Sequence, residues 1–149
     1  MILRDAIIDD IPYIVDVHLR SFEGFFLTSL GPCFLNELYR AFAFRQDGVL
    51  RVICDDQGRV FGFASGTLSP TNFYQSLKRE RSLHFLIKAV PSLFRSPKLV
   101  IRKLWYGFFY KGEKPSSLQD SALLSSIAIA PERSGESFGS ILLRDFELS

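Results

Sequence analysis

The stretch that decides the fold is residues 121–149, which read SALLSSIAIAPERSGESFGSILLRDFELS. Its apolar first part, residues 123–130, predicts a strand that ends at Pro131. A loop of small residues follows at 134–139, and apolar residues then recur at the spacing of a helix. The first amides of a helix point outward without an intrahelical partner. A strand, a small-residue loop and a helix N-terminus together therefore favour the binding of an anion.

The residues upstream predict an alternation of strands and helices. Asp9 or Asp10 is expected to cap the first helix, and Gly31 with Pro32 opens the second. The expected elements are a strand at 1–6, helices at 11–22 and from 32, and strands at 49–54 and 60–68 joined by a hairpin turn at 55–58.

The strand end IAIAP at 127–131 and the loop SGESFG at 134–139 resemble the acetyl-CoA-binding motif of the GCN5-related N-acetyltransferases, the GNAT superfamily. In that family a strand ending in IAVxP is followed by [Arg/Gln]-x-x-Gly-x-[Gly/Ala] and a helix. Gly139 matches the last position, whereas Ser134 replaces Arg or Gln and Ser137 replaces Gly. The resemblance implies an α/β (α+β) fold with a mixed, mostly antiparallel sheet flanked by helices.

The length of 149 residues suits a single domain, residues 1–149. The resemblance covers residues 1–69 and 121–149, which leaves 70–120 as a helical insertion between the third and fourth strands, with helices expected at 82–90 and 99–110. Ten Lys and Arg against two Glu give residues 71–114 a net charge of +8, although the whole chain carries only +2. This basic, aromatic composition fits an anionic membrane surface or an anionic acceptor, and equally a helical insert packed on the domain with a solvated basic face. Nucleic acid is less favoured, because no recognition helix is visible.

GNAT proteins continue past the corresponding helix with a fifth strand, a further helix and usually two more strands. The sequence given ends at Ser149, so the resemblance implies a C-terminally incomplete domain whose fourth strand lies at a sheet edge. A fragment, a shortened gene, and a partner or second copy that completes the sheet all fit this pattern.

The resemblance implies that acetyl-CoA is the co-substrate. Its pantetheine arm would pair with the edge of the fourth strand, and its pyrophosphate would meet the amides of the loop. Arg133 could replace the charge missing at Ser134. The implied cofactor-binding residues are Ile127, Ala128, Ile129, Arg133, Ser134, Gly135, Glu136, Ser137, Phe138, Gly139 and Ser140.

Candidate catalytic residues are few. Glu23 follows the first predicted helix, where the acceptor site begins in relatives, and could bind or deprotonate an amine; a solvated carboxylate is the alternative. Ser125 and Ser126 should face opposite sides of their strand, and Ser126 is the candidate for a water chain. His18 lies on an apolar stripe, which is typical of a core histidine, although its pKa would suit a base.

The sequence thus predicts a CoA-dependent N-acetyltransferase acting on a small amine, such as an amino sugar or a nucleotide-linked sugar. Phe25, Phe26 and Tyr39 are the candidate walls of the acceptor pocket, although core packing would explain them equally well. The alternative is a catalytically impaired binding module that uses the basic insertion. Glu136 favours this alternative because it places negative charge where phosphates would bind.

The two cysteines, Cys33 and Cys54, match no metal-site spacing and are predicted to be reduced core thiols, so no metal is expected. Charged residues interrupt the start of the chain, and no run of about 18 apolar residues occurs. The sequence therefore predicts a cytoplasmic protein, with attachment to the inner membrane face as a variant.

Overall fold

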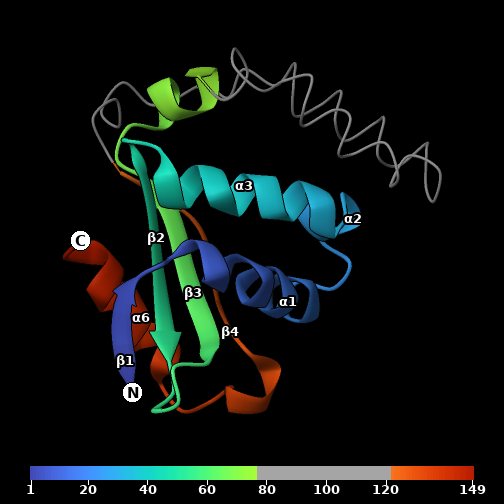
Figure 1. The fold of residues 1–149 in the computed structure, drawn as a ribbon, viewed down its shortest axis with the longest axis vertical. Coiled ribbons are helices and arrows are strands. Elements are labelled where there is room, and N and C mark those ends of the chain that lie inside the picture. The colour runs from blue at the N-terminus through green and yellow to red at the C-terminus, as the bar shows by residue number, and fades with distance from the viewer. Residues whose placement is uncertain (77–121) are drawn as a thin grey trace.

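A four-stranded sheet carries the fold, with its strands in the order β1-β2-β3-β4 and every neighbouring pair antiparallel (Figure 1). The computed structural model of the chain describes residues 1–76 and 122–149. The strands are β1 (Ile2–Asp5), β2 (Gly48–Cys54), β3 (Val60–Thr67) and β4 (Leu123–Ile129). The predicted hairpin between β2 and β3 is confirmed: the Asp55 carboxylate accepts the backbone N–H groups of Gln57 and Arg59, both at 2.9 Å.

Helices cover both faces of this sheet (Figure 1). α1 (Ile11–Ser21) and α3 (Pro32–Phe44) pack on one face, and α6 (Phe138–Glu147) packs on the other. Residues 70–76 are also helical. The shorter elements are η1 (Ile8–Asp10), α2 (Phe26–Ser29) and η3 (Pro131–Arg133). The predicted α/β class with a mostly antiparallel sheet is confirmed at this level. The helices predicted at 82–90 and 99–110, and the basic charge around them, lie outside the described residues.

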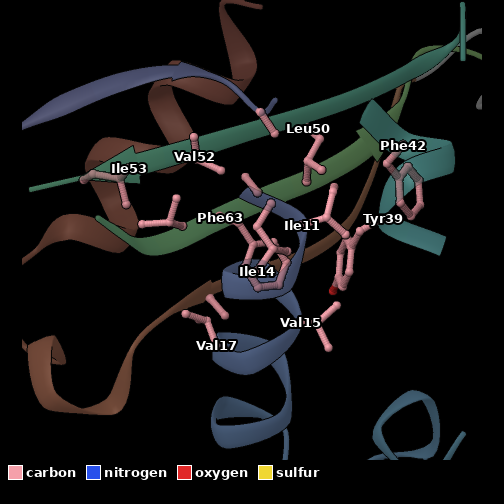
Figure 2. Close-up of a cluster of buried hydrophobic side chains, with 14 of the residues drawn as sticks. Ile11, Ile14, Val15, Val17, Tyr39, Phe42, Leu50, Val52, Ile53 and Phe63 are labelled. Atoms are coloured by element: carbon pink, nitrogen blue, oxygen red, sulfur yellow. The ribbon is translucent and has the colours of Figure 1, made fainter. Parts of the chain in front are cut away.

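The main core lies between the sheet and the helix pair α1 and α3 (Figure 2). Leu50 and Val52 of β2 and Phe63 of β3 point toward the helices because side chains alternate along a strand. Complete burial of each such side chain contributes about 1.5–3 kcal/mol. The helices add Ile11, Ile14, Val15, Val17, Tyr39 and Phe42, all buried.

On the opposite face of the sheet, α6 lies close to the strands, and few large side chains separate the two layers. Gly66 of β3 lies directly beneath Phe146, and a Cβ at this position would overlap both the Phe146 ring and the Leu123 carbonyl oxygen. Arg51 of β2 reaches across to α6, where its Nε lies 2.7 Å from the Asp145 carboxylate. A glycine in the strand and a half-buried ion pair therefore position α6.

Two expectations are corrected. The Asp10 carboxylate does not cap α1; it accepts the Ile7 N–H at 2.8 Å and binds Arg4, so it fixes the turn before the helix. Burial opposes ionisation of Asp10, but these hydrogen bonds outweigh it and hold its pKa below the ordinary value. Cys54 is buried as predicted, whereas Cys33 is exposed because it lies in the first turn of α3, on the side facing solvent. Among the described residues, no helix is long and apolar enough to cross a bilayer.

Candidate functional site

A cavity of about 430 Å³ lies between α1, the segment that enters α2, and strand β4. Aromatic rings form much of its wall, and the polar groups come from one histidine and two serines. The lining residues are His18, Phe22, Phe25, Phe26, Leu27, Leu124, Ser125, Ser126 and Ile127. Its volume falls within the range of about 300–1,000 Å³ that is typical of small-molecule sites.

A sharp turn after α1 brings the aromatic wall into place. Gly24 adopts a φ of 80°, which is the left-handed region that glycine enters without steric cost. The chain then returns, and the Thr28 hydroxyl donates to the Phe22 carbonyl at 2.6 Å. The rings of Phe22 and Phe25 consequently pack edge to face, with centroids 5.6 Å apart.

Strand β4 contributes both of its serines because its pairing with β3 is irregular. Ser65 lies opposite Ser126, but Gly66 lies opposite Leu124, so Ser125 has no direct partner. Such a bulge re-aims side chains and breaks the alternation of an ideal strand. Ser125 and Ser126 therefore line the same cavity, and the expectation that they face opposite sides is wrong.

His18 lines the cavity and is 2% exposed. Its Nδ1 lies 2.6 Å from the Tyr39 hydroxyl, whereas its Nε2 is buried without a partner among the described residues. Burial lowers the pKa of His18 to about 4, so the imidazole is neutral near pH 7. Burial also raises the pKa of Tyr39, against the opposing effect of a hydrogen bond from Ser126.

The structure brings some of the predicted acceptor-site residues together and separates others. Phe25, Phe26 and Ser126 line the cavity. Tyr39 does not form a wall: it is 0% exposed because α3 turns it into the core, where its ring lies 5.0 Å from that of Phe63. Glu23 is exposed and is not among the lining residues.

In the part of the chain that the structure describes, no strand pairs with the second edge of β4, and this free edge runs beside the cavity. The Ala130 N–H donates to the Phe61 carbonyl at 2.7 Å, which makes these two residues a hydrogen-bonded pair. Because hydrogen-bonded and non-hydrogen-bonded pairs alternate, the backbone groups of Ile127 and Ile129 point away from β3. The Ser21 hydroxyl donates a hydrogen bond to the Ile129 carbonyl oxygen at 3.2 Å, which agrees with a carbonyl that points away from β3.

The loop after η3 leads into α6 through two residues with left-handed backbone. Gly135 has a φ of 90° and Ser137 a φ of 60°, and both are exposed. A Cβ at Gly139 would meet nothing within 4 Å, so a ligand can approach the first turn of α6. The Arg133 guanidinium instead lies over the Phe61 ring, 4.4 Å from its centroid.

Sequence reasoning did not place His18 at a cavity. Its place on the apolar face of α1 predicted burial correctly, but not a cavity beside it. The feature that reveals the cavity is the contact of a buried histidine on α1 with Tyr39 on α3. This contact depends on the tertiary structure and cannot be seen in the sequence. Among the described residues, no group of three His, Cys, Asp or Glu side chains could hold a metal ion.

No protein-family model matches the chain, and neither the curated proteins nor the solved structures contain a match to it.

Proposed function

We propose that this protein is a GNAT-type N-acyltransferase that moves an acetyl group from acetyl-CoA to the amine of a small molecule. One observation carries the proposal: the cavity lies against Ile127 on the free edge of β4, and the same strand leads through η3 to the N-terminus of α6. A site for an acyl acceptor, an edge for an extended arm and a helix N-terminus for phosphates thus follow one another along a single segment.

The cofactor would lie along β4. Its extended pantetheine arm would hydrogen-bond to the outward N–H and C=O of Ile127. Its pyrophosphate would meet the amides that begin α6, those of Phe138 and Gly139. Small side chains leave this end of the helix open, but the exposed Glu136 carboxylate beside it repels phosphate.

The reaction needs a neutral amine nitrogen beside the thioester carbon. The nitrogen forms a bond to that carbon, the carbon–sulfur bond breaks, and the proton released by the nitrogen ends on the departing thiolate to give the CoA thiol. An outward N–H of β4 could stabilise the oxyanion that develops; such a donor contributes about 2.7–4 kcal/mol in other enzymes.

The test is acetyl-CoA binding by isothermal titration calorimetry, with a charge-matched pair of variants. Glu136→Lys should tighten binding by about threefold to tenfold, because it replaces repulsion by attraction near the phosphates. Glu147→Lys makes the same change in net charge at the other end of α6, where residue 147 is exposed, and should leave binding unchanged. Raising the salt concentration should reduce the difference between the two variants.

A second variant blocks the N-terminus of α6 with a large side chain, to test whether the phosphates bind there. Gly139→Leu adds a side chain into open space, so the fold should persist by circular dichroism while acetyl-CoA binding falls at least tenfold. The proposal is overturned if neither the natural chain nor Glu136→Lys binds acetyl-CoA. It is also overturned if Gly139→Leu binds as tightly as the natural chain.

A further inference from the structure

Among the described residues, no charged side chain lines the cavity, and nearly all the buried polar side-chain atoms have hydrogen-bond partners. None of its nine lining residues is Asp, Glu, Lys or Arg. The Ser125 hydroxyl lies 2.9 Å from that of Tyr74, and Ser126 hydrogen-bonds to Tyr39. Tyr39 also meets Nδ1 of His18, so among the described residues Nε2 of His18 is the one buried side-chain polar atom left without a partner.

The side chain that carries this atom lines the cavity, so we take Nε2 as the anchor for a ligand. A buried polar atom without a partner costs free energy that a ligand hydrogen bond would recover. Among backbone groups of proteins, an unpaired buried N–H is rarer than an under-satisfied carbonyl oxygen. The 2.6 Å contact between Nδ1 and the Tyr39 hydroxyl is compatible with either tautomer; the one with its proton on Nδ1 presents a lone pair on Nε2, and the proposal below takes this tautomer.

We propose that the cavity binds an amine with an aromatic or alkyl body, held by one hydrogen bond from the amine nitrogen to Nε2 of His18. The rings of Phe22, Phe25 and Phe26 would enclose the body of the ligand. The inference rests on the proposed function only in taking this amine to be the acyl acceptor. This ligand replaces the amino sugar expected from the sequence. An amino sugar carries several hydroxyl groups, and the described lining offers them one buried side-chain atom without a partner, Nε2 of His18.

The absence of charge in the lining also selects the protonation state of the amine. An ammonium ion would enter an apolar cavity without a carboxylate to pair with, which is strongly unfavourable. The groups facing His18 are the Tyr39 hydroxyl and the rings of Phe22 and Phe63, none of them charged near pH 7. The neutral amine therefore binds, and it is also the form that can attack a thioester.

The experiment measures binding without acetyl-CoA, by calorimetry and by nitrogen NMR of histidine-labelled protein, with benzylamine, benzyl alcohol and glucosamine as probes. Benzylamine should bind at least tenfold more tightly than glucosamine. Below the pKa of benzylamine its affinity should rise about tenfold for each pH unit, because only its neutral form binds. Benzyl alcohol has the same ring and no charge, so its affinity should not change between pH 7 and 9.

Variants of His18 identify the anchor. His18→Leu should weaken benzylamine binding about tenfold, which is the loss of one hydrogen bond. His18→Gln retains a neutral polar group and should recover part of that affinity, and Tyr13→Leu, at an exposed position on α1, should have no effect. If the His18 variants unfold, the NMR signal of Nε2 in the natural protein tests the contact instead, because this signal should shift when benzylamine is added.

The outcomes separate this inference from the proposed function. Tight glucosamine binding, affinity for benzylamine that is independent of pH, or an Nε2 signal that benzylamine leaves unmoved would overturn the inference. Acetyl-CoA binding would still support the acyltransferase. Benzylamine binding by a chain that does not bind acetyl-CoA would overturn the acyltransferase and leave the amine site standing.

Discussion

The two faces of the sheet are built in different ways. On the face of α1 and α3, large side chains such as Phe63 and Phe42 fill the space between layers, and a cavity remains beside them. On the face of α6, Gly66 lets one helix lie close to the strands, and Leu142 is the only residue of that helix that is buried. The cavity described here thus lies on the face that large side chains build.

The largest expected effect comes from breaking the bulky face. Phe63→Ala should lower the free energy of unfolding by about 3–5 kcal/mol, because the ring is 0% exposed and its removal leaves a void. The matched change on the other face, Phe146→Ala, removes a half-buried ring and should cost about 1–2 kcal/mol. Urea denaturation followed by circular dichroism measures both values. Equal losses would show that the faces do not differ in this way.

The next effect concerns the buried histidine on the bulky face. Its pKa is 6.5 when unfolded and about 4 when folded, so the unfolded chain takes up the proton first as pH falls. Stability should therefore decrease by about 3 kcal/mol between pH 6.5 and pH 4. His18→Gln should remove this part of the pH dependence in urea denaturation. Asp10 acts at lower pH, since its stabilisation is lost only as pH falls through its lowered pKa.

The close face is tested by adding a single methyl group. Gly66→Ala should cost about 1–3 kcal/mol, because its Cβ overlaps the Phe146 ring and neighbouring backbone. Gly139→Ala is the control: its Cβ meets nothing within 4 Å, and alanine favours the helix by about 0.5–1 kcal/mol. Thermal unfolding should move in opposite directions for the two variants. A neutral result for Gly66→Ala would mean that α6 is not held by close approach.

The smallest effect lies in the loop that leads to α6. Ser137 has a φ of 60°, which strains any residue with a Cβ, so Ser137→Gly should stabilise the protein by up to about 1 kcal/mol. Ser134→Gly should instead destabilise it by about 0.5–1 kcal/mol, because Ser134 has a φ of −69° that needs no glycine. If both changes destabilise equally in urea, strain at Ser137 is absent.

Local signals in the sequence predicted the elements well. The Gly31-Pro32 start of α3, the hairpin at 55–58 and the strand–loop–helix order at the C-terminal end are all confirmed. Turn and helix-start chemistry is local, so residues near one another in the chain specify it. The acetyl-CoA role of the loop stays a prediction.

The features that the sequence did not reveal depend on distant partners. The bulge at Ser125 is defined by pairing with β3, across more than fifty intervening residues. The contact of His18 with Tyr39 depends on how α1 and α3 cross. Tyr39 was a candidate for the pocket wall, with core packing as the alternative, and it is buried in the core. Helical spacing assigns a residue to a face of its helix, but it does not say how deeply the neighbouring helix covers that residue.

The edge of β4 bears on whether the protein aggregates. A long open edge invites a strand of another molecule to join it. Here Ser21 holds the Ile129 carbonyl at one end, and the bulge at Ser125 distorts the strand at the other. The regular, unoccupied part of the edge is thus centred on Ile127. A strand of a second molecule that joined the edge here would therefore compete with the proposed extended ligand for the backbone groups of Ile127.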